Sequence, residues 1–517
     1  MPPLRFRPLV LAVVSVVCAL VPLFDAESSA AEDDAGGVSG SVFLDKNGNG
    51  VRDAGEPGFG GVGVALSGHT RQGETLYLTT RTDAQGHYAF PGARIGQGST
   101  FTVTTGGVPL AAAVPGKYSA ARTFYVATDG NDKNPGSRER PFRTIGKAVP
   151  LLVAGDVLYI RQGEYREYVS SMNRPIGGGQ SWDRPIVVAG VPGETVVVKP
   201  PKPCTDLLIN LTFQRQQYLV FENLVLDAED VTQPYKSQSR DGKEPPPCHI
   251  RLLDCELMHA EGSAVFALGD DHQFINCRIH DNGHSRKAHG LYISSSHNLI
   301  QGCDIYRNAG WGIHFYNGSE PTACDSVIRG NRVHDNDVSG TGSPCIGLHT
   351  GAKNLVYDNV IWSNPRGIVV SINGVQESIF NNTIYGCEAG GIIIMSDSET
   401  HDNVVRNNIV IGSHNPQIYG ESKSTVIDHN LTSGAPLFRD AAALDFHLQA
   451  ASPAIGAGVN IPEVRYDHDG IARPQGKACD LGAYEHSADT FLPTTHQHSE
   501  LYLAGQKFQT DIGFATK

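Results

Sequence analysis

The chain has 517 residues and a formal net charge of −13, with 58 Gly and only 4 Met. This length allows more than one domain, and abundant Gly with scarce Met favours a turn-rich β protein over a helical one. The acidic balance argues against nucleic acid as the main partner, because phosphate binding needs a basic face. An anionic ligand would need a local basic patch, since the overall field would repel it.

The N-terminal segment has the pattern of a signal peptide. Arg5 and Arg7 precede an apolar run over residues 9–24, and small residues follow at 29–31. The run is short for a membrane span, and its basic start is typical of export signals. We therefore predict a signal peptide at residues 1–31 and a soluble, secreted or cell-surface mature chain without a membrane span. The alternative is an uncleaved anchor.

Residues 38–108 are predicted to form a separate small β-sandwich. Short alternating apolar runs bounded by Gly clusters indicate its strands. Near its start, oxygen-bearing side chains recur at the spacing of a calcium loop, and Gly50 permits the sharp turn. We expect calcium as the cofactor, with a polar surface turn as the alternative. The expected ligands are Asp45, Asn47, Asn49, Asp53 and Glu56.

This module also carries a resemblance. The string VSGSVFLD at residues 38–45, the Asp/Asn loop after it and the string TDAQGHYAF at residues 82–90 resemble the SdrD B-type (Cna B-like) repeats of bacterial surface proteins. The resemblance implies a calcium-rigidified stalk or spacer, and it says nothing about catalysis.

Residues 109–121 form a linker rich in Ala, Gly and Pro, and residues 122–435 are predicted to form the main domain. The strings TFYVA at 123–127 and GDVLYIR at 155–161 resemble the N-terminal cap of secreted β-helix proteins that act on polysaccharides. A short helix over residues 145–153 is expected to cover the open end of the first coil and protect its sheet edges.

From residue 218 onward the sequence repeats with a loose period. The unit is an apolar strand, an Asn or Cys, a turn that often holds a second Asn, and a Gly before another apolar strand. After a first gap of 32, the units recur every 22 to 28 residues, the length of one three-strand coil. The first column is Asn223, Cys255, Cys277, Cys303, Asn331, Asn359, Asn382 and Asn408; the second is Asn282, Asn308, Asn336 and Asn364; the third is Gly290, Gly312, Gly347, Gly367 and Gly391.

The columns predict an all-β fold, a right-handed parallel β-helix preceded by the small β-sandwich. Stacked coils place equal positions about 4.8 Å apart, so Asn amides can hydrogen-bond along a column. Leucine-rich repeats would need Leu at consensus positions, and propeller blades would need about 40 residues each. The chain thus resembles pectate-lyase-like β-helix proteins.

The cysteines divide into two groups. Cys255, Cys277 and Cys303 share the first column, and we expect them to form a stack of buried, reduced thiols. Cys204 and Cys248 lie beside prolines in polar insertions, which makes them the expected disulfide in an exported protein.

Two segments follow the repeat. Residues 436–486 resemble the C-terminal end segment of many secreted β-helix proteins, and we expect them to be a structural cap. Residues 487–517 look like a tail and are poorly informative.

Chemistry on a β-helix belongs to turns that depart from the minimal coil and to outward side chains. Long turns at residues 281–290 and 335–345 flank a short one at 308–312, which predicts a trough with Trp311 and His314 near its floor. Counting two residues past each Gly of the third column places Tyr292, His314 and His349 on the outer face of consecutive coils. His280 and His334 are expected beside the trough.

The residue types in the trough suggest roles. The candidate catalytic residues are His289, His314, His349, Arg286, Lys287 and Tyr292, and the candidate substrate-binding residues are Trp311, Asp281, Asp335 and Asp337. For any single His, a tolerated residue on a polar face is the simpler interpretation. Zinc is disfavoured, and calcium between the three Asp is a minor alternative.

Three functions stay open for a carbohydrate-active protein that we expect to be a monomer, and a polysaccharide lyase is favoured over a glycoside hydrolase. A polysaccharide lyase on an acidic polysaccharide needs cations to neutralise a uronate and a base to remove its C5 proton, which Arg286, Lys287 and the histidines can supply. A glycoside hydrolase would need paired carboxylates, for which Asp304 joins the three Asp above. A non-catalytic cell-surface glycan-binding or adhesion protein is the third, favoured by the stalk-like module.

Overall fold

The computed structural model describes residues 120–486, apart from 192, 213–215, 240–243, 317, 319–322, 396–398, 414–416, 421–423, 470 and 472, together with short strands nearer both ends of the chain. The chain separates into two compact units, Tyr118–His486 and Met1–Lys117 with Ser487–Lys517. In the described residues, no helix has the length and apolar character of a membrane span.

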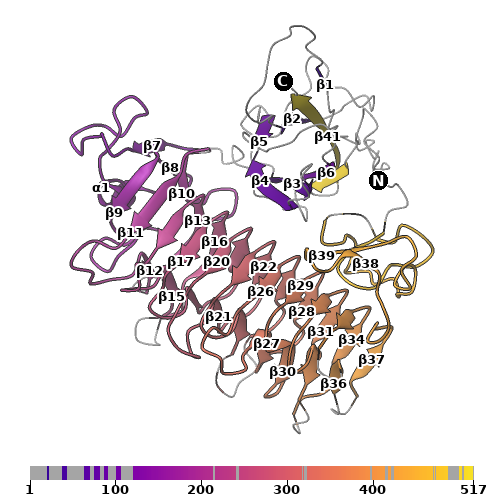
Figure 1. Ribbon diagram of the computed structural model, residues 1–517. Helices are drawn as coiled ribbons and strands as arrows, with labels where there is room; N and C mark the ends of the chain where they lie inside the picture. The colour runs from indigo at the N-terminus through magenta and orange to yellow at the C-terminus, as the bar shows by residue number, and fades with distance from the viewer. Residues whose placement is uncertain are drawn as a thin grey trace, which may run out of the picture. The chain divides into compact units, whose positions relative to one another are not determined.

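The larger unit is built from three parallel sheets that run along its length (Figure 1). The twelve-stranded sheet contains β7 (Thr123–Val126), β8 (Val157–Ile160), β10 (Ile186–Gly190), β13 (Gln217–Glu222), β16 (Cys248–Leu253), β19 (Gln273–Ile275), β22 (Leu299–Gln301), β25 (Val327–Arg329), β28 (Leu355–Tyr357), β31 (Ser378–Phe380), β34 (Val404–Arg406) and β37 (Val426–Asp428). The ten-stranded sheet contains β9 (Gly163–Arg166), β11 (Val196–Lys199), β14 (Val225–Asp227), β17 (Glu256–Met258), β20 (Arg278–His280), β23 (Asp304–Tyr306), β26 (Arg332–His334), β29 (Val360–Trp362), β32 (Thr383–Tyr385) and β35 (Ile409–Ile411). The nine-stranded sheet contains β12 (Ile209–Leu211), β15 (Tyr235–Ser237), β18 (Val265–Ala267), β21 (Leu291–Ile293), β24 (Ile313–Phe315), β27 (Pro344–His349), β30 (Arg366–Ser371), β33 (Ile392–Ile394) and β36 (Ile418–Gly420).

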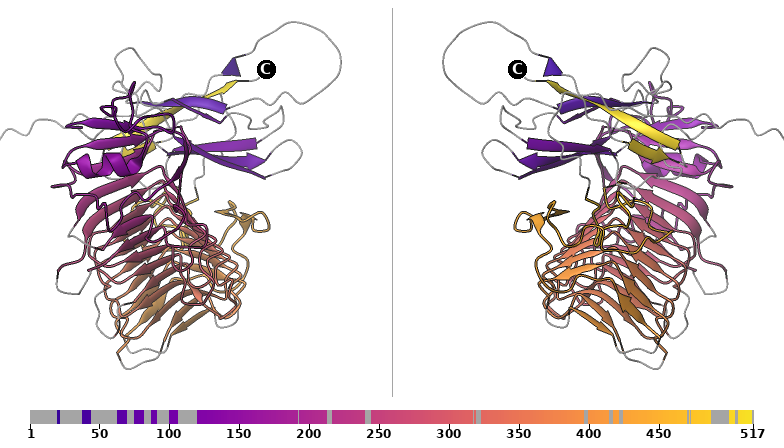
Figure 2. Two further views of the ribbon diagram at one scale, coloured as in Figure 1. Left: turned by 90° about the vertical axis from the view of Figure 1, so that its left-hand side faces the viewer. Right: turned by 90° about the vertical axis from the view of Figure 1, so that its right-hand side faces the viewer.

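Each complete coil contributes one strand to each sheet, and each strand pairs in parallel with its counterpart in the next complete coil. Ile293 of β21 pairs with Phe315 of β24, which in turn pairs with Leu348 of β27. These three side chains are fully buried in the interior of the stack. The turned views in Figure 2 show the coils one behind another. The predicted right-handed parallel β-helix is confirmed.

The predicted asparagine columns are also confirmed as hydrogen-bonded ladders. In the first column, the side-chain Nδ2 of Asn331 donates to Oδ1 of Asn359 over 2.9 Å, Asn359 donates to Asn382 over 2.9 Å, and Asn382 donates to Asn408 over 3.0 Å. Asn430 continues it at 2.9 Å. Each buried amide also donates to a backbone carbonyl, so the ladder satisfies groups that would be costly to bury unpaired.

The cysteine stack has the predicted form, whereas the predicted disulfide is wrong. Cys255, Cys277 and Cys303 are buried free thiols that donate to backbone carbonyls at 3.4 to 3.5 Å. Neither Cys204 nor Cys248 is in a disulfide. Their surroundings explain this, because Cys204 lies against the Tyr168 hydroxyl at 3.8 Å while Cys248 stands in β16 opposite Gln217.

The N-terminal end of the coil stack is covered as expected by a short helical segment. It consists of α1 (Ile145–Ala148) followed by the 3₁₀ turn Val149–Leu151. The Thr144 hydroxyl caps α1 by accepting from the backbone N–H of Lys147. Ile145 is fully buried and joins the interior cluster of the coils.

The C-terminal segment packs against the side of the stack, not over its end. It carries the hairpin of β38 (Phe438–Asp440) and β39 (Asp445–Leu448), visible beside the ten-stranded sheet in Figure 1. Phe438 and Phe446 cluster with Trp362 on the outer face of that sheet. Ile427, in the interior column of the last coil, is 40% exposed. The segment expected as a structural cap thus packs on the side of the coils, because aromatic side chains there offer it an apolar surface.

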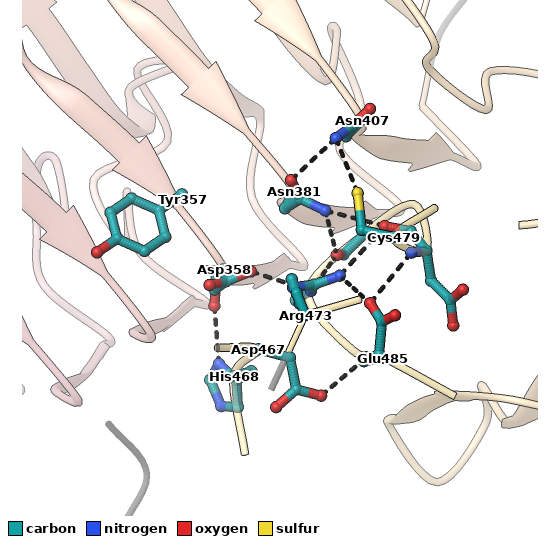
Figure 3. Close-up of polar contacts among 12 residues, drawn as sticks. Tyr357, Asp358, Asn381, Asn407, Asp467, His468, Arg473, Cys479 and Glu485 are labelled. Atoms are coloured by element: carbon teal, nitrogen blue, oxygen red, sulfur yellow. Dashed lines mark hydrogen bonds and ion pairs between the residues drawn. The ribbon is translucent and has the colours of Figure 1, made fainter. Parts of the chain in front are cut away.

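A buried polar network holds this segment in place (Figure 3). The Arg473 guanidinium contacts the Asp358 carboxylate at 3.0 Å and the Glu485 carboxylate at 2.8 Å, and all three side chains are at most 2% exposed. Nδ1 of His468 lies 2.9 Å from the backbone oxygen of Asp358. Since Asp358 directly follows β28 and the other three residues belong to the C-terminal segment, the network links that segment to the coils.

The smaller unit is described only by its strands. They are β1 (Leu20–Val21), β2 (Val38–Phe43), β3 (Gly63–His69), β4 (Thr75–Arg81), β5 (His87–Phe90), β6 (Thr100–Thr105), β40 (Glu500–Leu503) and β41 (Gln506–Ala515). β3 pairs antiparallel with β4 and β6, and β2 pairs antiparallel with β5 and β41. Segment 487–517, which looked like a tail, thus adds strands to this unit. The predicted calcium ligands from Asp45 to Glu56 lie outside the described residues.

Candidate functional site

A pocket of about 420 Å³ opens on the outer face of the nine-stranded sheet, above β24, β27 and β30. Its described lining residues are Arg286, Lys287, His289, Trp311, His314, Thr341, Gly342, Ser343, Pro344, His349, Arg366, Val369, Ser371 and Met395. Arg, Lys, His and Trp make up half of this set, and the described lining contains no Asp or Glu.

The predicted arrangement of turns around the trough is present. The backbone N–H of Gly310 in the short turn donates to the oxygen of Ala288 in the first long turn over 2.6 Å, and the Gly310 oxygen accepts from Asp337 of the second over 2.9 Å. A Cβ on Gly310 would lie 2.6 Å from the oxygen of Arg286. Glycine is therefore required for this close approach, which sets Trp311 between the two long turns.

The predicted row of outward side chains needs one correction. Tyr292 pairs with His314, as expected, but His314 pairs with Gly347, and His349 pairs with Ser371. The sequence pattern places Gly347 in the third column. In the structure Ile313 pairs with Ile346, so Cys345 is the residue opposite Gly312 in that column. His349 still faces outward, because residues 347 and 349 of one strand point to the same side.

Gly347 makes room for the Trp311 ring and does not form a sharp turn. A Cβ at this position would lie 1.7 Å from Cζ3 of Trp311. The indole therefore occupies the space above Gly347, and its ring centre lies 3.9 Å from that of His314 and 4.6 Å from that of His349. Trp311 forms the floor between the two imidazoles, as the sequence predicted for it and His314.

Three predicted histidines come together around Trp311. The ring centres of His289 and His314 are 4.7 Å apart, and those of His314 and His349 are 5.2 Å apart. The backbone N–H of Trp311 donates to Nδ1 of His289 over 3.1 Å, and Nε2 of His289 lies 3.2 Å from Nδ1 of His314. Tyr292 borders the cluster, with its ring 5.3 Å from that of His314.

Burial keeps these imidazoles neutral. It lowers the pKa of His289 to about 4, with a further lowering from His349. It lowers the pKa of His314 to about 2, with help from the neighbouring imidazoles of His289 and His349. Burial also lowers the pKa of His349 to about 4. All three can therefore act as neutral donors or acceptors near pH 7.

Three cations surround the histidines. Arg286 and Lys287 are exposed on the first long turn, and within the described part of the chain neither forms an ion pair. Arg366 starts β30, and its guanidinium donates to the backbone oxygen of Gly342 in the second long turn. Arg366 is not among the residues that the sequence predicts for the site. Its place directly before Gly367 of the third column was the signal that could have found it, because that position adjoins the pocket turns.

The predicted acidic residues lie elsewhere. Asp281 pairs with Arg307 at 2.6 Å, and Asp335 contacts His334 at 2.7 Å. Asp337 is buried and accepts hydrogen bonds from the Thr341 hydroxyl and the Gly342 N–H, so it shapes the second long turn. None of these carboxylates lines the pocket.

His280 and His334 do not border the trough either. They stand in β20 and β26 of the ten-stranded sheet, stacked on the two faces of Tyr306 with ring centres 4.6 and 5.1 Å away. Each imidazole is bridged by two carboxylates, for example His280 by Glu256 at 2.8 Å and Asp281 at 2.7 Å. Within the described residues, no group of three or more His, Cys, Asp or Glu is placed to hold a metal ion.

Three segments of the chain match known families. Residues 250–432 match the family described as right handed beta helix region, and residues 37–123 match the SdrD B-like domain. Residues 128–172 match a family described as a protein of unknown function.

Curated relatives share only short segments. A stretch of 75 residues is 33% identical to uncharacterized protein YwoF of Bacillus subtilis (strain 168), covering 14% of this chain and 15% of that protein. A stretch of 126 residues is 26% identical to a capsule K30/K69-specific depolymerase of Klebsiella phage K64-1, covering 24% of this chain and 16% of that protein. The chain thus spans less than a fifth of the length of either relative.

Among solved structures, the chain is similar to pectate lyase Pel9A, with 17% identity, a TM-score of 0.49, and coverage of 71% of this chain and 97% of that one. It is also similar to a rhamnogalacturonan lyase, with 16% identity, a TM-score of 0.47, and coverage of 70% and 96%. The coil stack and the family matches support one assignment: the chain is a right-handed parallel β-helix protein whose residues 37–123 match the SdrD B-like domain.

Proposed function

We propose that the protein is a carbohydrate-active β-helix protein whose pocket binds an acidic polysaccharide, and that it cleaves the polymer as a lyase. One observation carries the proposal. The pocket places Arg286, Lys287 and Arg366 around neutral imidazoles, and its described lining has no carboxylate. In a chain with a net charge of −13, such a basic pocket favours an anionic ligand.

The pocket supplies the groups that β-elimination needs. The cations neutralise the uronate carboxylate, which makes the C5 proton acidic enough to remove. A neutral imidazole takes that proton, the electron pair forms the C4–C5 double bond, and the C4–oxygen bond breaks. The departing oxygen then takes a proton from water, and the imidazole returns its proton to water. His349 is the base in this proposal, because it is half-buried and its described contacts are ring contacts alone, with Trp311, His314 and Tyr316.

Two further observations support a polymer substrate. Trp311 lies on the pocket floor, where an aromatic ring can stack on a sugar ring. The Klebsiella phage relative is named a capsule depolymerase, and it shares 126 aligned residues with this chain. A polymer of this kind is met outside the cell, which agrees with the signal peptide predicted for residues 1–31.

A glycoside hydrolase is the less favoured function. It would need two carboxylates on either side of the scissile bond, and Asp281, Asp335 and Asp337 do not line the pocket. Binding without cleavage is kept as the second candidate, because the match to the SdrD B-like domain relates the chain to surface proteins.

The test is a screen of the full chain against acidic polysaccharides, among them polygalacturonate, alginate and hyaluronate, with neutral xylan for comparison. Ultraviolet absorbance detects the unsaturated uronate product, and a reducing-end assay detects any cleavage. We expect both signals to rise together on one acidic polymer. Reducing ends without ultraviolet absorbance would show a hydrolase, and retention on the polymer without either signal would show a binding protein.

The charges are tested by a matched pair of double variants. Arg286→Ala with Lys287→Ala removes two cations from the pocket, whereas Lys133→Ala with Arg140→Ala removes two exposed cations near the N-terminal cap. Charge-assisted hydrogen bonds contribute about 1.5–3 kcal/mol each, so the first pair should lower kcat/KM at least about tenfold. Equal activity of both double variants would place the anion elsewhere.

A further inference from the structure

The three histidines do not have equivalent roles. We propose that His289 fixes His314 as the tautomer with its proton on Nε2, so that His314 is a neutral hydrogen-bond donor to the substrate carboxylate and not a base. His289 is then a positioning residue, which acts through His314. The identity of the carboxylate rests on the proposed function, whereas the tautomer does not.

The first step of the argument is the backbone of Trp311. A backbone N–H can only donate, and that of Trp311 donates to Nδ1 of His289 over 3.1 Å. Nδ1 of His289 must therefore carry a lone pair. The turn cannot easily release this contact, because the N–H of the preceding Gly310 is tied to the oxygen of Ala288 at 2.6 Å.

The second step passes the proton assignment to His314. A neutral imidazole with a lone pair on Nδ1 has its proton on Nε2. Nε2 of His289 lies 3.2 Å from Nδ1 of His314, with geometry suited to a hydrogen bond. His289 therefore donates, and Nδ1 of His314 accepts. The proton of neutral His314 must then be on Nε2.

The third step is the position of that proton. Nε2 of His314 is buried and has no hydrogen-bond partner among the described residues. The residue lines the pocket and is 8% exposed. Buried N–H groups without a partner are rare in native proteins. We therefore infer that a ligand bound in the pocket supplies the acceptor for this N–H.

Burial keeps His314 neutral, and the charges of the pocket define the acceptor. His289 and Trp311 pack on it from the turns, Tyr292 from β21, Tyr316 from the end of β24 and His349 from β27. Arg286, Lys287 and Arg366 are the charged groups of the pocket. No described carboxylate lines the pocket beside His314 to favour a second proton, and the three cations and the Nε2–H of His314 can only donate. A carboxylate, with acceptor lone pairs only, matches such a set.

The tautomer can be measured without any activity. Long-range proton–nitrogen NMR on the full chain, labelled with ¹⁵N-histidine, distinguishes a proton on Nε2 from one on Nδ1. We expect His289 and His314 both to show the Nε2–H pattern, unchanged between pH 5 and pH 8. An Nδ1–H pattern or a doubly protonated ring at His314 in that range would overturn the proposal.

Two substitutions separate the bonds that His289 makes. His289→Gln keeps an N–H donor near the Nε2 position, and His289→Asn keeps an acceptor near the Nδ1 position. We expect the Gln variant to retain the Nε2–H pattern of His314, and the Asn variant to show a mixture of tautomers. Circular dichroism checks that both fold. The same mixture in both variants, or in neither, would show that His289 does not set the tautomer.

The ligand is tested with sodium galacturonate and with neutral galactose as the control. Galacturonate should shift the Nε2 and Hε2 signals of His314, and galactose should not. If the tautomers are as expected but neither sugar shifts His314, the donor does not meet a uronate and the substrate half of the proposal is wrong. If galacturonate shifts His314 but no acidic polymer is cleaved, the donor role stands and the lyase function fails.

In a lyase, the roles would also separate in kinetics. His349→Gln should lower kcat at least about a hundredfold, because general base catalysis is lost. His289→Asn should lower kcat/KM and shift its pH profile, and His289→Gln should restore most of the loss. Loss of similar size in both His289 variants, with an unchanged pH profile, would reduce His289 to a structural residue.

Discussion

The indole of Trp311 lies in the space that a side chain on Gly347 would fill, with 1.7 Å between Cζ3 and the position of a Cβ. The two residues belong to successive coils, and their contact sets the floor of the pocket. Trp311 also donates its backbone N–H to His289. The position of the histidines therefore depends on the space that Gly347 leaves for the indole.

We predict that Gly347→Ala displaces the indole and lowers both stability and activity. Overpacking of this kind costs about 1–3 kcal/mol. Urea denaturation should show the loss of stability, and tryptophan fluorescence should report the moved ring. Gly476→Ala is the control, because no atom lies within 4 Å of the Cβ position there. Wild-type fluorescence and stability in Gly347→Ala would mean that the indole does not rest on residue 347.

A second prediction concerns the buried ion pairs of Figure 3. Arg473→Met should leave Asp358 and Glu485 buried without their cation, at a cost of about 3–5 kcal/mol. Burial already raises the pKa of Asp358, against the effect of Arg473. Chemical denaturation measures the change, and exposed Arg465→Met should leave stability within about 0.5 kcal/mol. Equal stability of the two variants would contradict this role of the network.

A third prediction is a pH dependence of stability from His447. Burial lowers the pKa of His447, but the carboxylates of Asp469 at 2.7 Å and Asp445 at 2.5 Å raise it to about 10. A pKa raised on folding stabilises the protein fully below the unfolded value of about 6.5. This contribution is lost as pH rises through about 10.

The wild type should therefore lose stability between pH 7 and pH 10 relative to His447→Gln, measured as Tm over that range. Both proteins share all other titrating groups, so the difference between their curves isolates His447. Parallel curves across the window would show that the imidazole does not hold its proton between the two carboxylates.

A fourth prediction is calcium binding by the loop from Asp45 to Glu56, proposed from its spacing alone. Isothermal titration of the chelator-treated full chain should show calcium binding, and Asp45→Asn with Glu56→Gln should weaken it at least about tenfold. Calcium should also raise the Tm of the transition that belongs to this unit. If the double variant and the wild type gave the same titration heats, calcium would bind to another part of the chain.

The scaffold could be predicted because its signals repeat. Asn331, Asn359 and Asn382 recur at the coil length, and stacking turns that spacing into a ladder whatever the turns between them do. The trough followed from turn lengths, and His289, His314 and Trp311 meet there. Residue types and spacing were sufficient for these features, since each depends on contacts between neighbouring coils.

The remaining features depend on packing that no spacing encodes. Gly347 looked like a column glycine, although it makes room for a ring from the previous coil. Asp281 and Asp335 looked like ligands because they sit on the flanking turns, yet their nearest partners are Arg307 and His334. The position of the C-terminal segment depends on an apolar surface formed by Trp362 and its neighbours, which exists only once the coils are stacked.

The second asparagine ladder lies between the strands that form the coils and the turns that form the pocket. Asn282 donates to Asn308 over 2.9 Å, and Asn308 donates to Asn336 over 2.9 Å. Each of these residues lies at or next to the first residue of one of the three turns that build the pocket, and the turns differ in length. Since the ladder holds each coil in register before its turn starts, residues can be inserted or exchanged in the turn without disturbing the strands. Substrate preference could therefore be transplanted between β-helix proteins by exchanging these turns, while the coils beneath remain unaltered.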